Sequence, residues 1–194
     1  MFSRRTLPVW IGVILLSGMF LMGQGWSPQS EPPAPVPKTG QTTIYATGDD
    51  GHLQMGVASP SPRFTDNGNG AVTDNLTGLI WTKDADCDGK KTWNNALSYC
   101  NALANGTCGL SDGSVAGDWR LPNVRELYSL IDYGTTYPAL PTGHPFTDVG
   151  DPTWVATTVA NTTTLAWAVS LHGGQVYYRD KAIIYYVWCV RDGQ

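Results

Sequence analysis

The spacing of apolar residues changes period along the chain and predicts a mixture of strands and helices. Residues 63–83 contain Asn-Gly at positions 67 and 69 and Leu-Thr-Gly at 76–78. These turn-forming sequences divide the segment into short stretches, a pattern typical of short strands joined by tight turns. In residues 92–103 the apolar positions recur at steps of three and four, which predicts an amphipathic helix capped by Thr92.

Residues 123–132 predict a second helix, in which Asn123 is the N-cap and Glu126 occupies the capping-box position. Glu126 is the only glutamate after position 31, so a pair of glutamates for acid–base catalysis is not available. Just before this helix, Arg120 lies beside Trp119. We expect Trp119, Arg120, Asn123 and Glu126 to be structural residues that tie loops together.

The last third of the chain predicts a long irregular stretch after Tyr133, followed by three short strands at 165–171, 175–179 and 185–191. Strands and helices are thus segregated rather than regularly alternating. The expected fold class is α+β.

The first 41 residues differ from the rest. Arg4 and Arg5 precede an uncharged apolar run, so residues 1–26 are interpreted as a signal peptide or an N-terminal anchor. Residues 27–41 are rich in proline and predict an extended linker. The folded domain is placed at 42–194, in a protein that is exported to the periplasm, the cell surface or the medium.

The net charge limits the kind of molecule the chain can bind, and the cysteine content predicts its disulfides. The chain has 12 basic and 16 acidic residues, and removal of Arg4 and Arg5 with the signal leaves 10 and 16, a net charge of −6. Nucleic acid is therefore not an expected partner, and a membrane is expected only through an uncleaved anchor. Four cysteines in an exported chain predict two disulfides, with three possible connectivities.

Acidic residues at 84–89 offer one candidate metal site. Asp84, Asp86 and Asp88 match the opening of a calcium loop, but its twelfth position is Asn95 rather than glutamate. An acidic, solvated turn is the alternative. Ser111 sits in a chance match to the nucleophile-elbow pattern, because it follows a helix instead of a strand. No other cofactor is expected.

Several motifs in order resemble the Lcl C-terminal domain family of exported bacterial proteins: "YATGDDGHLQMGV", "PRFTDNGNGAVTDNLTGLIWTKDADC", "TWNNALSYCNAL", "GDWRLPNVRELYSLID" and "YYVWCVR". The family resembles the C-type-lectin-like fold and, through Trp-Arg-Leu-Pro, formylglycine-generating-enzyme-like domains. The resemblance implies two helices flanking a small twisted antiparallel sheet, with a long loop region. It also implies the disulfides Cys100–Cys189 and Cys87–Cys108.

The same resemblance limits the expected function. Formylglycine-generating enzymes use a C-terminal cysteine pair, and this region holds Cys189 alone. The Glu-Pro-Asn, Gln-Pro-Asp and Trp-Asn-Asp strings of calcium-dependent lectins do not occur. We expect a non-enzymatic binding or adhesion domain for a glycan or protein. The alternatives are a formylglycine-generating-type enzyme with substituted residues and a hypervariable lectin-fold receptor.

The expected binding surface lies on the C-terminal strands and the loop before them. In 185–191, Tyr185 and Val187 should share the side of Cys189, while Tyr186 and Trp188 face the other way. Flat rings with a few polar groups suit a sugar or a protein partner. The predicted ligand-binding residues are Trp154, His172, Tyr177, Tyr178, Arg179, Tyr186 and Trp188; alternatively, most of these rings pack beneath the long loop.

Overall fold

The computed structural model of the chain describes residues 36–193, so the predicted signal or anchor and most of the predicted linker lie outside the described residues. Within 36–193, no helix combines the length and the apolar character needed to cross a membrane. The elements are α1 (Asp50–Leu53), β1 (Phe64–Asp66), β2 (Ala71–Asp74), β3 (Ile80–Thr82), α2 (Trp93–Ala102), α3 (Val124–Tyr128), β4 (Thr153–Thr158), β5 (Leu165–Val169), β6 (Val176–Asp180) and β7 (Val190–Arg191).

One antiparallel sheet has the strand order β1-β2-β3-β7 and joins the start of the domain to its end. Trp81 is the register partner of both Val72 in β2 and Val190 in β7. The turn between β1 and β2 needs its glycine, because a Cβ on Gly70 would lie 2.3 Å from the carbonyl oxygen of Gly109. The predicted strand–turn–strand–turn–strand pattern of residues 63–83 is confirmed.

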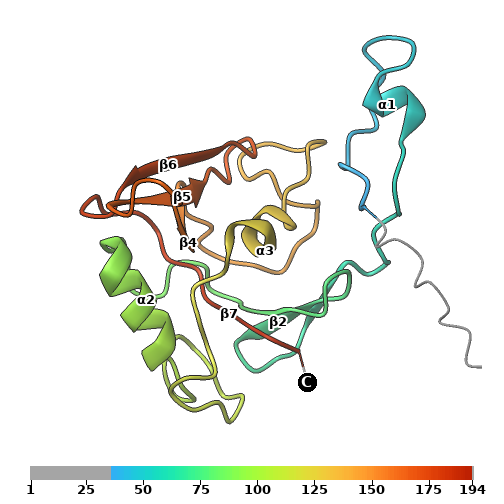
Figure 1. The fold of residues 1–194 in the computed structure, drawn as a ribbon. Helices are drawn as coiled ribbons and strands as arrows, with labels where there is room; N and C mark the ends of the chain where they lie inside the picture. The colour runs from blue at the N-terminus through green and yellow to red at the C-terminus, as the bar shows by residue number, and fades with distance from the viewer. Residues whose placement is uncertain (1–35, 194) are drawn as a thin grey trace, which may run out of the picture. The chain divides into compact units, whose positions relative to one another are not determined.

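The second antiparallel sheet has the order β4-β5-β6, with β6 at its edge. Helix α2 packs on one face of this sheet and α3 on the other (Figure 1). Neighbouring residues of β6 therefore face different helices. Tyr177 and Arg179 lie on the side of α2, and Tyr178 is paired across the sheet with Trp167 on the side of α3.

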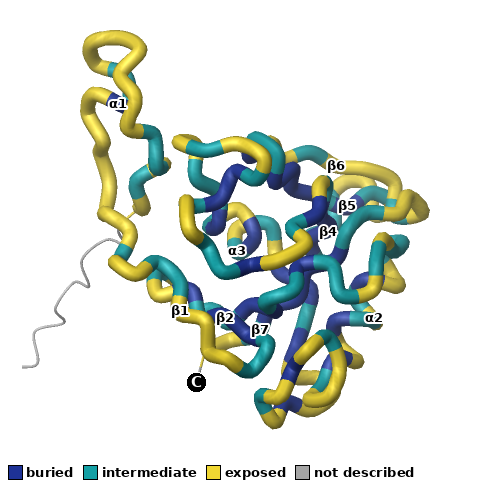
Figure 2. The backbone as a smooth tube through the Cα atoms, turned by 180° about the vertical axis from the view of Figure 1, so that it is seen from behind, coloured by how far each residue is buried: buried dark blue, intermediate teal, exposed yellow. Residues whose placement is uncertain are grey.

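The core consists of two apolar clusters, and residues 187–190 contribute side chains to both. Val187 and Cys189 belong to the cluster beneath α2, and Trp188 belongs to the cluster beneath α3. Figure 2 shows this segment among the buried parts of the backbone. The predicted alternation is confirmed for Val187, Trp188 and Cys189, but there both sides of the segment meet core rather than one side meeting solvent.

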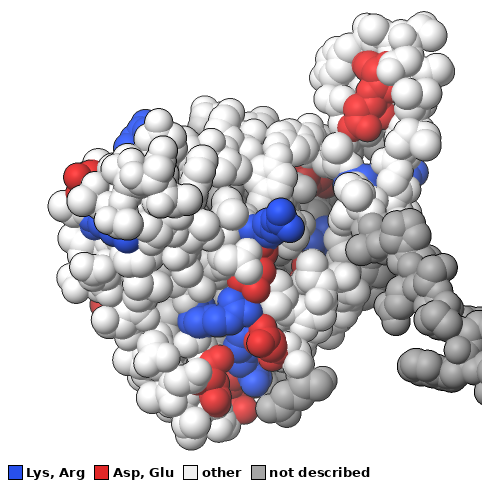
Figure 3. Space-filling view, viewed as in Figure 1, with Lys and Arg blue, Asp and Glu red and all other residues white. Residues whose placement is uncertain are grey.

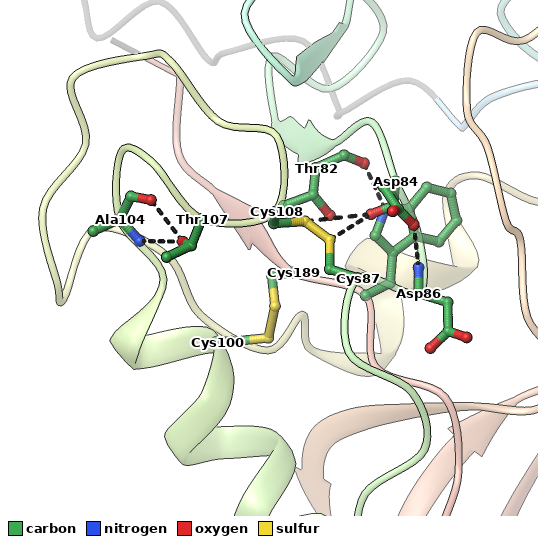
Figure 4. Close-up of a disulfide and its surroundings, with 10 residues drawn as sticks. Thr82, Asp84, Asp86, Cys87, Cys100, Ala104, Thr107, Cys108 and Cys189 are labelled. Atoms are coloured by element: carbon green, nitrogen blue, oxygen red, sulfur yellow. Dashed lines mark hydrogen bonds between the residues drawn. A yellow bond between two sulfur atoms is a disulfide. The ribbon is translucent and has the colours of Figure 1, made fainter.

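Two disulfides hold helix α2 in place, one to the last strand segment and one between the segments on either side of the helix. Cys100 in α2 is bonded to Cys189 in the last strand segment, with Cα atoms 5.5 Å apart. Cys87 is bonded to Cys108, with Cα atoms 5.2 Å apart, and this bond closes the segment that contains α2 (Figure 4). Both pairings agree with those that the family resemblance implies.

The α+β class is confirmed, but the expectation of a single small sheet is wrong. The second sheet gains β4, which lies in the stretch predicted to be irregular; residues 129–152 do lack helices and strands. Of the predicted strand 185–191, only β7 is a regular strand, and α3 ends earlier than predicted. The lectin-like arrangement remains a prediction.

Candidate ligand-binding site

An open groove of about 550 Å³ runs along the N-terminal half of α2. One side of this α2 groove comes from the segment before the helix and from the polar face of the helix itself. The other comes from the segment that connects β6 to β7. The lining residues are Lys90, Lys91, Thr92, Asn95, Ser98, Tyr99 and Ile184.

Basic side chains in and beside the α2 groove lie over aromatic rings. The Lys90 Nζ is 4.5 Å from the centre of the Tyr186 ring, and the Lys91 Nζ is 4.7 Å from that of Tyr99. On β6 and just after it, two more basic side chains do the same. The Lys181 Nζ is 3.8 Å from the centre of the Trp93 ring, and the Arg179 guanidinium carbon is 4.8 Å from that of Tyr177. In a cation–π contact the positive group lies over the negative face of the ring and keeps its charge.

Buried backbone and indole contacts fix the floor of the α2 groove. Lys91 and Tyr185 exchange backbone hydrogen bonds of 2.9 and 3.0 Å. The Trp154 indole donates to the Lys91 carbonyl oxygen at 3.0 Å. The Trp154 backbone amide donates to the Tyr186 carbonyl oxygen at 3.0 Å. Trp154 is therefore a support for the groove.

The phenols beside the α2 groove are proton donors. Burial, followed by the negative charges of Asp88, Asp84 and Asp86, raises the pKa of Tyr99 to about 12. Burial and the neighbouring Tyr185 likewise raise the pKa of Tyr177 to about 12. Tyr99 lines the groove, so its protonated hydroxyl group can donate to a ligand oxygen.

The charged residues that line the α2 groove are Lys90 and Lys91, although the chain as a whole is acidic. No carboxylate is among its lining residues. Asp88 lies nearby and pairs with Lys91 at 2.6 Å, which leaves Lys90 as the unneutralised lining charge. The first turn of α2 has no acidic residue, and Thr92 makes no side-chain capping bond. The positive end of the helix dipole adds to the attraction for an anion.

The structure divides the predicted binding residues among several places. Tyr177, Arg179 and Tyr186 lie on the side of the α2 groove. Tyr178 faces the opposite side of the sheet, paired with Trp167. His172 lies in a separate cavity of about 270 Å³ with Tyr137 and Asp151.

Two of the predicted contacts are wrong. Trp154 and Trp188 are completely buried, so neither can lie on an exposed patch. Trp188 donates to the Thr82 carbonyl oxygen at 2.9 Å and packs edge-on against Phe146. Large aromatic side chains fill the two core clusters because they bury the most apolar area.

The three acidic residues of the candidate calcium loop have separate roles. The Asp84 side chain accepts a hydrogen bond from the Asp86 backbone amide at 2.9 Å (Figure 4), and Asp88 pairs with Lys91. Burial and the charge of Asp84 raise the pKa of Asp86. In the part of the chain that the structure describes, no three acidic, histidine or cysteine side chains are placed to hold a metal.

The residues predicted to be structural form a connected network at the start of α3. The Asn123–Glu126 capping box is confirmed. Arg120 donates to both Glu126 oxygens at 2.7 and 2.9 Å and to Asp192 at 2.6 Å. Trp119 is completely buried and donates to Ser114 at 3.0 Å.

The sequence patterns did not identify the residues that line the α2 groove as binding residues. The signal was present as the polar face of the predicted helix, where Asn95 and Ser98 are three residues apart and follow a Lys-Lys pair. An apolar period identifies the buried face of a helix, but it does not show whether the opposite face borders a hollow.

The family comparison agrees with the motifs in the sequence. Residues 70–191, more than half of the chain, match the Lcl C-terminal domain. A comparison with curated proteins finds no match. The match covers the second sheet, the first sheet except β1, the α2 groove and both disulfides. The chain belongs to the Lcl C-terminal domain family.

Proposed function

We propose that this protein is an exported, non-enzymatic binding domain that recognises an acidic glycan through the α2 groove, at the cell envelope or outside the cell. The observation that carries the proposal is the composition of the α2 groove. Two lysines that lie over aromatic rings, Lys90 and Lys91, are combined there with hydroxyl and amide side chains around one open groove. Aromatic rings offer flat apolar contact to a sugar ring, and lysines offer point charges to carboxylate or sulfate groups.

The lining residues support binding in preference to catalysis. Ser98 donates its hydroxyl hydrogen to the Asn94 carbonyl oxygen at 3.1 Å, and no histidine or carboxylate lines the groove to activate it. Thr92, Asn95 and Ser98 are instead suited to hydrogen bonds with sugar hydroxyl groups. The overall acidity of the chain argues against long basic surfaces, but it does not oppose one local positive groove.

Export is supported by two independent features. Two disulfides are typical of proteins that fold in an oxidising compartment. The apolar run behind Arg4 and Arg5 is typical of an export signal or anchor. A pro-rich segment then connects this run to the domain, as in proteins that present a binding domain on a stalk.

A glycan array with neutral, uronic-acid and sulfated members tests the proposal, with and without calcium. The expected result is calcium-independent binding to acidic members, weakened about tenfold or more by Lys90→Ala. Lys83→Ala is the matched control, since Lys83 is also exposed but pairs with Asp66 elsewhere. Binding to neutral glycans alone, or to no glycan, would reject the proposal. Equal losses in both variants would place the site elsewhere.

A further inference from the structure

The two disulfides differ in their access to solvent. Cys100 is completely buried and Cys189 is 1% exposed, so this bond is closed to solvent in the folded domain. Cys87 and Cys108 are both partly exposed. They line an open hollow of about 340 Å³, and Cys108 also lines a second one of about 330 Å³. A thiolate must reach a sulfur atom to exchange with a disulfide, so the folded chain offers one bond for exchange.

Charged groups around the exposed disulfide are mostly paired. Lys83 pairs with Asp66 beside one hollow, and Asp88 pairs with Lys91 beside the other. Asp84 is the remaining charged residue that lines the two hollows. Acidic and basic side chains also lie next to one another on the face shown in Figure 3. One carboxylate slows an approaching thiolate without blocking its path, so access separates the two disulfides more strongly than charge does.

The Cys87–Cys108 bond closes the loop that builds most of the α2 groove. Six of the seven residues that line the groove lie between these two cysteines: Lys90, Lys91, Thr92, Asn95, Ser98 and Tyr99. The bond ties the segment before α2 to the segment after it. The positions of the lining residues before the helix therefore depend on this bond.

Direct contacts lead from the exposed disulfide to the α2 groove. Asp88 follows Cys87 in the chain, and it accepts hydrogen bonds from the Lys91 ammonium group at 2.8 Å through its carbonyl oxygen and at 2.6 Å through its carboxylate. Lys91 in turn lies over the Tyr99 ring. Tyr99 lines both the groove and the hollow beside the disulfide. Opening the bond frees Cys87, and with it the residue that fixes the Lys91 side chain.

The rest of the domain keeps its attachments when this bond opens. The Cys100–Cys189 disulfide still joins α2 to the last strand segment. Backbone hydrogen bonds still join Lys91 to Tyr185. Reduction should therefore loosen residues 84–90 and the Lys91 side chain without unfolding α2.

We propose that the Cys87–Cys108 disulfide is a redox switch of the α2 groove, which a dithiol opens in the folded domain so that the groove binds its ligand more weakly. The affinity falls because the site loses its pre-organised geometry. The inference rests on the proposed function for the identity of the ligand, but not for the reduction itself.

The reaction is a two-step thiol–disulfide exchange. One thiolate of the dithiol attacks a sulfur atom of the pair, which forms a mixed disulfide and releases the other cysteine to take up a proton. The second thiolate of the dithiol then displaces the remaining cysteine, which is protonated in turn. The dithiol leaves as a disulfide, so two electrons and two protons have passed from it to Cys87 and Cys108.

Stepwise reduction of the purified, folded chain with dithiothreitol tests which disulfide opens. Free thiols are trapped with N-ethylmaleimide at each concentration and located by peptide mapping. Cys87 and Cys108 should be labelled together, at concentrations at which Cys100 and Cys189 stay bonded and the circular dichroism spectrum stays native. Labelling of all four cysteines at once, or of Cys100 and Cys189 first, overturns the proposal.

Amide hydrogen exchange tests the effect on the groove in the absence of any ligand. In the selectively reduced chain, exchange in residues 84–90 should become about tenfold faster, while the second sheet exchanges as before. The matched variant Cys87→Ser/Cys108→Ser should exchange like the reduced wild type and show no response to the same dithiothreitol concentration. Unchanged exchange in residues 84–90 after selective reduction overturns the switch, whether or not the variant folds.

Calorimetric titration with a uronic-acid oligosaccharide separates the switch from the proposed function. The oxidised chain should bind about tenfold more tightly than the selectively reduced chain, and glutathione disulfide should restore the affinity by re-forming the bond. Equal affinity of the two forms overturns the switch. Failure of the oxidised chain to bind contradicts the glycan proposal instead, and hydrogen exchange then decides on the switch.

Discussion

Asp74 is a completely buried carboxylate that forms an ion pair with Arg63 and also accepts hydrogen bonds from the Leu76 backbone amide and the Thr77 hydroxyl group. Arg63 donates to its two oxygens at 2.7 and 2.9 Å and also to the Ser129 carbonyl oxygen at 3.0 Å. Removing one member of a buried ion pair leaves the other charge without compensation. Arg63→Ala should therefore lower the free energy of unfolding by about 3–5 kcal/mol in urea titrations.

The matched comparison for Arg63 is Lys83, whose pair with Asp66 is about two-fifths exposed on both sides. Exposed pairs contribute little because water and salt screen them. Lys83→Ala should leave the urea midpoint almost unchanged. Similar losses in the two variants would show that burial does not set the strength of the Arg63–Asp74 pair.

Tyr99 links the acidity of a phenol to stability. Its pKa is raised to about 12 by burial, whereas an exposed tyrosine in the unfolded chain ionises near pH 10. The folded state keeps the proton longer, so stability is constant below about pH 10 and falls as pH rises toward about 12. Urea titrations at pH 9, 10 and 11 should show a shallower fall for Tyr99→Phe than for the wild type. An identical slope would contradict the buried phenol.

At the scale of the element, α3 is short and depends on its cap. Asn123→Ala removes the acceptor of two backbone hydrogen bonds, from Arg125 and Glu126. It should lower the free energy of unfolding by about 0.5–2 kcal/mol. Glycan binding should be unchanged, because α3 lies across the second sheet from α2. A fully stable variant that loses binding would place the site at α3.

The two disulfides should contribute unequally. Cys100–Cys189 spans 89 residues and Cys87–Cys108 spans 21, and a longer closed loop restricts the unfolded chain more. Replacing the first pair by serine should cost about 4.5 kcal/mol and the second about 3 kcal/mol, measured by urea unfolding. Peptide mapping of the non-reduced protein checks the pairing itself. A Cys87–Cys100 bridge would contradict it.

Elements with one buried face were predictable from the sequence, and elements buried on both faces were not. Helix α2 shows its three- and four-residue apolar period because Asn95 and Ser98 remain exposed to the groove. In β4, Trp154 and Val155 are adjacent and both buried, in different core clusters. No alternation of apolar and polar residues marks such a strand, so the sequence pattern predicts an irregular segment there.

At the scale of the whole molecule, the candidate site could be predicted only in part. Tyr177, Arg179 and Tyr186 were predicted as binding residues because aromatic and basic residues gather in the last strands, and they lie on the side of the α2 groove. Lys90 was missed because it reaches Tyr186 only through the packing of segments 96 residues apart. Trp154 and Trp188 were misplaced for a related reason: alternation distinguishes two sides of a strand, but it does not reveal that both sides are core.

The central claim is that the α2 groove binds an acidic glycan through charge as well as ring contact. Calorimetric titration with a uronic-acid oligosaccharide and its carboxyl-reduced counterpart tests it most directly. The acidic form should bind at least tenfold more tightly, and the difference should shrink as salt is raised and in Lys90→Ala. Equal affinity for the two oligosaccharides, or a preference that Lys90→Ala leaves intact, would contradict the claim.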